Sequence, residues 1–307
     1  MQAQTTTNKN GEFIRAPSTF RSWVTEDGAA GSSGVGGFAA EPGRYHLYVA
    51  YNCPWAHRTI IIRALKQLEE VISLSAVHPQ RSSEGWTFLS GDAVSTDDLN
   101  RFSYLKEAYH LADSSYAGRF TVPVLWDKKS NTIVNNESAD IIRMLNSAFN
   151  AITPVQNDYY PLALRSQIDS INDFIYHNVN NGVYRAGFAK SQSAYDQAYD
   201  DVFSALDKLE ELLSQQHYLV GEHITEADWR LFPTLIRFDV AYYGIFKCNK
   251  RRLIDYTKLW DYTRELYQLP GIAETVNFEH IKLGYWRKSE RNSTGIIPKG
   301  PDLSSLW

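Results

Sequence analysis

The order of strand-like and helix-like segments between residues 45 and 149 constrains the fold of this 307-residue chain more than any other feature. Short apolar or β-branched runs alternate there with segments whose apolar residues recur at helical spacing. The strand-like runs are 45–50, 71–77, 121–126 and 132–134, and the helix-like segments begin at Pro54 and span 103–112 and 137–149. The resulting order, βαβαββα, predicts an α/β domain with a thioredoxin-like fold.

From residue 161 onward the pattern is helical throughout, which predicts a second, all-α domain. The expected helices cover 162–178, 195–214, 227–246 and 259–268. Thr225 and Asp228 have the spacing of a capping box at the start of the third helix. We therefore expect four parts, namely an N-terminal arm with a Gly-rich loop (1–43), a thioredoxin-like domain (44–150), a helical domain (151–284) and a C-terminal tail (285–307).

Composition excludes several classes of protein. The chain has 31 basic and 35 acidic residues and a formal charge of −4, so we expect neither a nucleic-acid partner nor a membrane surface. Two cysteines cannot make a disulfide framework, and the sequence shows no secretory leader and no apolar run of about 20 residues. These features predict a soluble protein of the cytoplasm.

Cys53 is the candidate nucleophile. It follows a strand-like run and precedes Pro54 at the expected first position of a helix, where the helix dipole and free N–H groups favour a thiolate. Residue 56 is Ala, so no second thiol completes a C-x-x-C pair and a resolving thiol must come from elsewhere. The alternative is a cysteine that packs as a small apolar side chain, which is our expectation for Cys248.

Two further groups of residues could carry chemistry. His46 and His57 flank Cys53, but they repeat no ligand spacing and have no fixed carboxylate partner, so we expect neither a metal site nor a hydrolase. Glu137 and Ser138 begin a helix, where N–H groups, a hydroxyl and a carboxylate suit the end of an α-amino acid. Taken alone the pair indicates a simple helix cap, and its place after the TVP strand is what favours a ligand site. Pro123 is expected to bend its strand, with a cis peptide before it.

Several motifs together resemble one family. Cys53–Arg58 (CPWAHR), the Thr121–Pro123 segment (TVP) and the Glu137–Ser138 pair resemble a cysteine-containing cytosolic glutathione transferase. The segments FIRAPSTFRSWVTEDG, YNCPWAHR, NNGVYRAGFA and HIKLGYW, with the Gly85–Trp86 pair, resemble the glutathionyl-hydroquinone reductases, or Xi class. The resemblance extends over nearly the whole chain and implies the cytosolic glutathione transferase fold.

The resemblance also implies roles for individual residues. Cys53 would be the nucleophile, and the residues that would bind glutathione are Trp86, Arg119, Phe120, Thr121, Val122, Glu137 and Ser138. Tyr184 matches the family's proton donor and acceptor, and Tyr242 and Tyr285 match tyrosines near the sulfur, where a phenol stabilises a thiolate. The match of Tyr285 is the weakest, and Tyr243 could replace Tyr242.

The implied activity is glutathione-dependent reduction of S-glutathionyl-hydroquinones to hydroquinones, through a Cys53–glutathione disulfide that a second glutathione resolves, and it would serve quinone detoxification. Glutathione is then a co-substrate, glutathionylated aromatic molecules are the partners, and a homodimer is expected. Two alternatives remain open. An Omega-like dehydroascorbate reductase or protein deglutathionylase would share Cys53 without needing Tyr184, and a non-catalytic ligand-binding protein would need no reactive thiol.

Overall fold

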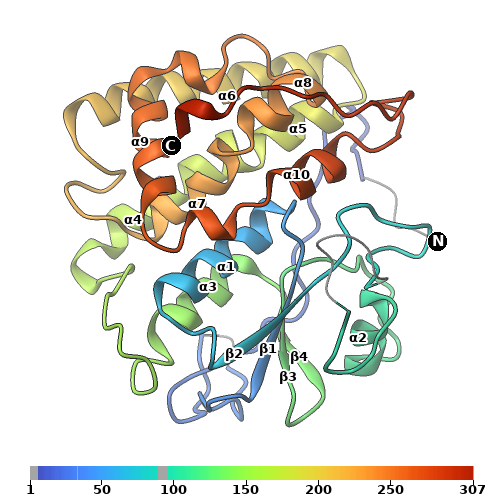
Figure 1. The fold of residues 1–307 in the computed structure, drawn as a ribbon, viewed down its shortest axis with the longest axis vertical. Coiled ribbons are helices and arrows are strands. Elements are labelled where there is room, and N and C mark those ends of the chain that lie inside the picture. Colours follow the sequence, from blue (N-terminus) through green and yellow to red (C-terminus); the bar gives the residue numbers. More distant parts are fainter. Residues whose placement is uncertain (1–5, 33, 89–95, 307) are drawn as a thin grey trace. The chain divides into compact units, whose positions relative to one another are not determined.

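The computed structural model describes residues 6–32, 34–88 and 96–306, which form two units (Figure 1). The first unit comprises Pro17–Asp158 and Thr275–His280. The second comprises Tyr159–Glu274 together with 6–16 and 281–306. The predicted boundaries after residues 43, 150 and 284 stay a prediction.

The first unit is built on a four-stranded mixed sheet in the order β2-β1-β3-β4. Strand β1 pairs in parallel with β2 and antiparallel with β3, and β3 pairs antiparallel with β4. The strands are β1 (Tyr45–Val49), β2 (Ile72–Ala76), β3 (Val124–Asp127) and β4 (Thr132–Asn135), and the helices are α1 (Pro54–Leu65), α2 (Leu105–Ala112) and α3 (Ser138–Ser147). This order confirms the predicted thioredoxin-like fold.

The core of this unit lies between the sheet and the helices α1 and α3, which pack side by side (Figure 1). All five residues of β1 are buried, and so are Ile61 of α1 and Ile141 of α3. The peptide bond between Val122 and Pro123 is cis, as predicted. Strand β3 begins only at Val124, three residues later than expected, because Pro123 has no N–H for the sheet.

The second unit is helical within the described residues, as predicted. Its longest helix is α6 (Gln192–Gln215), and the others are α4 (Arg165–Ile175), α5 (Gly182–Phe188), α7 (Glu226–Leu235), α8 (Tyr243–Ile245), α9 (Thr257–Gln268) and the end of α10 (Phe278–Tyr285). The short 3₁₀ turns of this unit are η1 (Leu162–Leu164), η4 (Leu253–Asp255) and η6 (Ser304–Leu306), and the π turns are η2 (Tyr176–Asn180) and η3 (Phe238–Tyr242). A further 3₁₀ turn, η5 (Ala273–Thr275), contains the point in the chain where the second unit gives way to the first.

The expectation of one continuous helix over 227–246 is wrong. Helix α7 ends at Leu235, and a π-helical turn over Phe238–Tyr242 follows before α8. Pro233 lies inside α7 and has no N–H to donate to the preceding turn, which weakens the helix near the point where it ends. The predicted helix over 162–178 is likewise divided, because α4 ends at Ile175 in a second π turn.

The capping box at the start of α7 is confirmed. The Thr225 hydroxyl accepts from the Ala227 N–H, and Asp228 accepts from the Thr225 N–H at 2.7 Å. Asp228 also accepts from the Leu219 N–H and from the Tyr262 hydroxyl. Burial raises the pKa of this carboxyl against the opposing effect of these hydrogen bonds. The residues form a fold-stabilising cluster.

The C-terminal tail is anchored at its end. Leu306 is fully buried within its unit, and the Gln268 side chain donates to its carbonyl at 2.8 Å.

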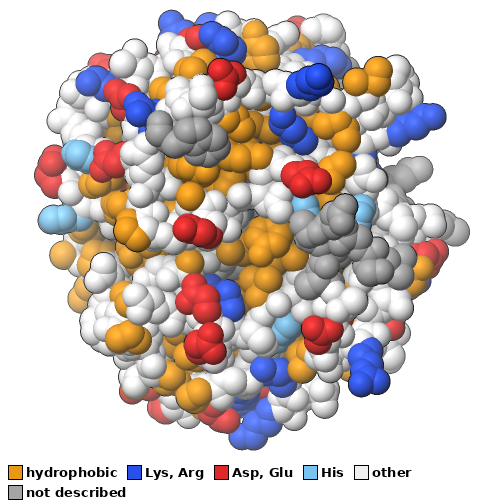
Figure 2. Space-filling model, viewed as in Figure 1, with side chains coloured by type: hydrophobic (Ala, Val, Ile, Leu, Met, Phe, Trp, Pro, Cys, Tyr) orange, Lys and Arg blue, Asp and Glu red, His pale blue; other side chains and the backbone are white. Residues whose placement is uncertain are grey.

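On the face shown in Figure 2, acidic and basic side chains are interspersed, in keeping with the nearly balanced composition. Among the described residues, no helix is both long and apolar enough to cross a bilayer.

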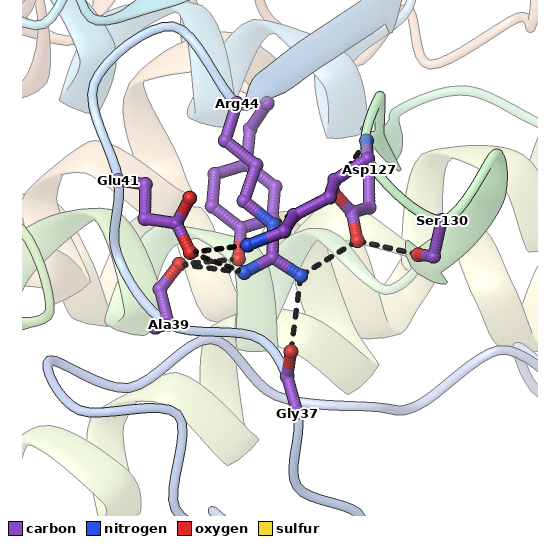
Figure 3. A network of polar contacts seen from close by, with 8 residues as sticks. Gly37, Ala39, Glu41, Arg44, Asp127 and Ser130 are labelled. Carbon is purple, nitrogen blue, oxygen red and sulfur yellow. Dashed lines mark hydrogen bonds and ion pairs between the residues drawn. The ribbon is translucent and has the colours of Figure 1, made fainter.

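An ion-pair network attaches the Gly-rich loop to the sheet (Figure 3). The Arg44 guanidinium donates two hydrogen bonds to Asp127 at 2.8 Å, and it also binds Glu41 and the carbonyl of Gly37. Burial of Asp127 opposes its ionisation, but hydrogen bonds from Arg44, Ser130 and the Lys129 N–H outweigh burial and lower its pKa. The loop is thereby held by a buried charge pair.

Replacing Asp127 by alanine is expected to lower the free energy of unfolding by about 3 kcal/mol, because the buried Arg44 loses both hydrogen bonds to its buried partner and keeps Glu41 and the loop carbonyls. The contribution is present above the ordinary carboxyl pKa of 3.8 and is lost as the pH falls through the lowered folded-state value. Urea unfolding at pH 7 measures the loss, with the exposed Lys129→Ala as control. Equal stability of the two variants would contradict the assignment.

Candidate active site

Cys53 is the N-cap residue of α1, and Pro54 occupies the first position of the helix. Its backbone is extended, with φ −84° and ψ 118°, and the residue is half-buried. The thiol lies 3.6 Å from the carbonyl oxygen of Val122. The thiol thus belongs to a half-buried residue at the positive end of a twelve-residue helix. These are the surroundings of a reactive thiol.

Cys248 has the opposite surroundings. It is fully buried in the second unit, and burial raises the pKa of its thiol to about 12. A thiol of this kind is protonated at neutral pH and packs as a small apolar side chain.

The loop before β3 presents backbone groups beside Cys53. The Tyr109 hydroxyl donates to the Thr121 carbonyl at 2.8 Å and accepts from the Thr121 N–H, and Phe120 packs edge-on against the Tyr109 ring. Among the described residues, the N–H of Val122 has no hydrogen-bond partner. A fixed loop with an unused N–H next to a thiol fits the main chain of a bound cysteinyl peptide.

Glu137 and Ser138 form the N-terminus of α3. One carboxylate oxygen of Glu137 accepts from the Ala139 N–H at 3.2 Å, and the other accepts from the Ser18 hydroxyl at 2.9 Å. Ser138 is buried, and the guanidinium of the buried Arg58 donates to its hydroxyl at 3.5 Å. The sequence had pointed to no role for Ser18 or for Arg58.

Trp86 and Arg119 lie in other loops of the same unit. Trp86 is buried, the guanidinium carbon of Arg81 lies 4.1 Å from its ring centroid, and its indole N–H has no partner among the described residues. The half-buried Arg119 accepts, through its carbonyl, a hydrogen bond from Tyr116 at 2.9 Å. A buried donor without a partner is the kind of group that a polar ligand satisfies.

In the second unit, the structure brings together the three tyrosines singled out from the sequence. The Tyr285 hydroxyl lies 2.5 Å from that of Tyr184 and 3.0 Å from that of Tyr242. Burial raises the pKa of both Tyr242 and Tyr285, and the neighbouring Tyr184 raises it further. Tyr242, and not the half-buried Tyr243, is the member of this cluster. The phenols of Tyr242 and Tyr285 are therefore protonated at neutral pH.

The N-terminal arm contacts this cluster within the second unit. The guanidinium carbon of Arg15 lies 5.0 Å from the ring centroid of Tyr184, and its Nε donates to Asn181 at 2.9 Å. Phe13 packs on Phe188, whose ring stacks on that of Tyr184. The motif FIRAPSTFRSW singled out the arm in the sequence. No local pattern in the sequence indicated that the arm contacts Tyr184.

The two histidines near Cys53 have structural partners. His46 Nδ1 lies 2.8 Å from the Ser73 hydroxyl, and His57 Nε2 lies 2.8 Å from the Thr275 hydroxyl. Within the described ranges, no group of three or more potential ligands could hold a metal ion. Burial, with Lys128 and Arg63 nearby, lowers the pKa of His46 to about 3.

This lowered pKa makes stability depend on pH. The unfolded chain binds a proton at His46 below its ordinary pKa of 6.5 and the folded chain does not, so stability falls as the pH drops from 6.5. Between pH 6.5 and 5 the loss is at most about 2 kcal/mol. His46→Asn should remove that part of the pH dependence in urea unfolding at pH 7, 6 and 5. An unchanged slope would contradict the assignment.

A cavity of about 230 Å³ lies elsewhere in the second unit, and none of the residues singled out from the sequence lines it. Its wall is mostly apolar, with Leu235, Val240 and Trp260, and includes the carboxylate of Asp239. That carboxylate already accepts from the N–H groups of Leu253 and Ile254. The cavity therefore contains none of the candidate catalytic or glutathione-binding residues.

Comparisons with known proteins match both parts of the chain. The model of the glutathione S-transferase N-terminal domain matches residues 52–148, and that of the C-terminal domain matches residues 192–265. Glutathionyl-hydroquinone reductase YqjG of Escherichia coli is 54% identical over 96% of this chain and 91% of its own length. Glutathionyl-hydroquinone reductase PcpF of Sphingobium chlorophenolicum is 48% identical over 96% and 92%.

Solved structures agree with these matches. The glutathione-bound structure of YqjG from Escherichia coli superposes with a TM-score of 0.90 at 55% identity and covers 92% of each chain. The glutathione S-transferase Xi of Phanerochaete chrysosporium gives a TM-score of 0.89 at 47% identity, over 94% of this chain and 97% of its own.

Proposed function

Because this chain belongs to the glutathione S-transferase family, and within it to the glutathionyl-hydroquinone reductases of the Xi class, we propose that it reduces S-glutathionyl-hydroquinones to hydroquinones with glutathione. The observation that carries the proposal is the half-buried Cys53 thiol at the N-terminus of α1, 3.6 Å from the Val122 carbonyl. A thiolate there can attack sulfur, whereas a serine or tyrosine could not accept a glutathionyl group as a disulfide.

In the proposed first step, the Cys53 thiolate attacks the glutathionyl sulfur of the substrate. The new bond is the Cys53–glutathione disulfide, and the bond that breaks joins that sulfur to the aromatic ring. The ring carbon takes the bonding electrons and a proton, so the hydroquinone leaves reduced while the two sulfurs are oxidised. A second glutathione thiolate then attacks the mixed disulfide, which releases oxidised glutathione and restores Cys53.

We propose Tyr184 as the source of the proton for the ring carbon. Carbon is a poor leaving group unless it is protonated as the bond breaks, so the reaction needs a general acid besides the thiolate. The Tyr184 hydroxyl is 2.5 Å from that of Tyr285, which in turn is 3.0 Å from that of Tyr242. In this proposal the two neighbours hold the Tyr184 phenol in position and return the proton to it.

For the glutathione molecule itself, we propose three groups of contacts in the first unit. The unused N–H of Val122 would pair with the cysteinyl main chain, with Thr121, Phe120 and Arg119 lining the peptide. Glu137 and Ser138 would hold the γ-glutamyl end, and Trp86, with its partnerless indole N–H, would pack over the peptide. These groups supply the donors and acceptors of a tripeptide with charged ends.

A comparison of substrates tests the proposed function. Steady-state rates are measured with an S-glutathionyl-hydroquinone, with dehydroascorbate and with a glutathionylated peptide, each with excess glutathione. We expect kcat/KM for the hydroquinone conjugate to exceed the others by about tenfold or more, which corresponds to 1.4 kcal/mol of transition-state discrimination. A preference for dehydroascorbate or for the peptide would overturn the proposal in favour of an Omega-like enzyme.

We also propose a location in the cytoplasm, which rests on the composition of the chain, and a homodimer, which rests on the family resemblance alone. Light scattering on the purified protein at micromolar concentration should give twice the mass of the 35.0 kDa chain. A monomer mass would contradict the dimer.

A further inference from the structure

We propose that Ser18, on the N-terminal arm, is a positioning residue that orients the Glu137 carboxylate toward the γ-glutamyl ammonium group of glutathione. This inference rests on the proposed function, because it deepens the role given there to Glu137. Its basis is the hydrogen bond of 2.9 Å from the Ser18 hydroxyl to Glu137, within the first unit. The same hydroxyl lies 3.2 Å from the Asn136 carbonyl, so the Glu137 carboxylate is the nearer and the charged acceptor.

The arm is fixed where Ser18 meets Glu137. Phe20 and Asn136 exchange two hydrogen bonds, from the Phe20 N–H to the Asn136 side chain at 3.1 Å and from the Asn136 N–H to the Phe20 carbonyl at 3.0 Å. The Asn135 side chain donates to the Ser22 carbonyl at 3.0 Å. The arm is thus tied to the residues directly before Glu137, so the Ser18 hydroxyl is held in place.

The two oxygens of the Glu137 carboxylate have different partners. Oε1 accepts from the Ala139 N–H and so caps α3, while Oε2 accepts from Ser18. Each oxygen accepts one hydrogen bond and keeps a further lone pair, and the residue is half-buried, so part of its surface is open to a ligand. With the Ser18 bond removed, the cap alone holds the carboxylate, and the group can rotate about its terminal bond.

The hydroxyl also leaves the charge of Glu137 available. Arg21, the nearby cation on the arm, makes a two-pronged ion pair with Asp140 through its Nε and Nη2. Ser18 is neutral, so it orients Glu137 without pairing its negative charge. An ammonium group would therefore meet a carboxylate that is both oriented and charged, which is the arrangement that gives strong charge-assisted hydrogen bonds.

The test compares Ser18→Ala with Ser18→Thr, which keeps the hydroxyl, and with Ser22→Ala on the same arm. Ser22 is half-buried like Ser18, and its hydroxyl has no hydrogen bond within the described part of the chain. Calorimetry measures the Kd for glutathione and for glutaryl-cysteinyl-glycine, which lacks only the α-amino group. Far-UV circular dichroism melts check that each variant is folded.

We expect Ser18→Ala to weaken glutathione binding about fivefold to tenfold and to change binding of the glutaryl peptide less than twofold. Ser18→Thr and Ser22→Ala should bind glutathione like the parent protein, and KM for glutathione should rise in Ser18→Ala while kcat stays unchanged. Equal losses for both peptides, or no loss, would overturn the positioning role. Since binding is measured directly, a failure of the proposed reductase activity would show separately, as absent turnover in the parent protein.

Discussion

Replacement of Cys53 by serine is expected to lower kcat/KM for an S-glutathionyl-hydroquinone by about three orders of magnitude or more. The serine hydroxyl is not ionised at neutral pH, and it cannot form the disulfide on which the second half of the reaction depends. The measurement is the steady-state rate in excess glutathione. Calorimetry should show that glutathione still binds, because the contacts proposed for it come from other residues.

Cys248→Ala is the matched control, since it removes the other sulfur of the chain. That thiol is fully buried and its pKa is raised to about 12, so it is not ionised at neutral pH. The variant should keep the parent's turnover. Turnover retained in Cys53→Ser, or lost in Cys248→Ala with the fold intact, would refute the assignment of Cys53 as nucleophile.

Tyr184→Phe is expected to lower kcat by about 10²-fold, because it removes the proton donor and keeps the ring. The ring contacts with Phe188 and Phe246 survive, so the fold should be unchanged. Alkylation of Cys53 by iodoacetamide should proceed at the parent's rate, which separates loss of the acid from loss of the thiol.

Tyr243→Phe serves as the control for this variant, since Tyr243 lies beside the cluster in sequence but is not part of its hydrogen-bonded chain. It should retain kcat. An unchanged rate in Tyr184→Phe would remove its role as acid. A slowed alkylation would instead indicate that the variant disturbs Cys53.

Much of the first unit follows from local sequence. The positions of Cys53 and Pro54, the cis peptide before Pro123 and the start of α3 each depend on residues adjacent in the chain. Local preferences also predict the helices of the second unit, but not where they break. The π turn over Tyr176–Asn180 contains no proline or glycine that would predict a break in the helix. Its position therefore depends on packing between distant residues.

Some residues of the candidate site also follow from local sequence, and others do not. The places of Cys53, Glu137 and Ser138 at helix starts could be predicted from the sequence, and so could their candidacy for the site. The sequence could not decide between Tyr242 and Tyr243. The two residues are adjacent, and the choice depends on which hydroxyl reaches Tyr285, which lies 43 positions after Tyr242 in the chain. The bond from Ser18 to Glu137 spans 119 positions, and no local pattern relates such residues.

The most direct test of Cys53 as the nucleophile is a mass measurement on the peptide that contains it after one turnover. The protein is mixed with a synthetic S-glutathionyl-hydroquinone in the absence of free glutathione, quenched in acid and digested without reductant. The proposed mechanism predicts one glutathionyl group in disulfide linkage on the peptide that contains Cys53, one equivalent of released hydroquinone, and loss of the adduct once glutathione is added. Release of hydroquinone with Cys53 unmodified would contradict it.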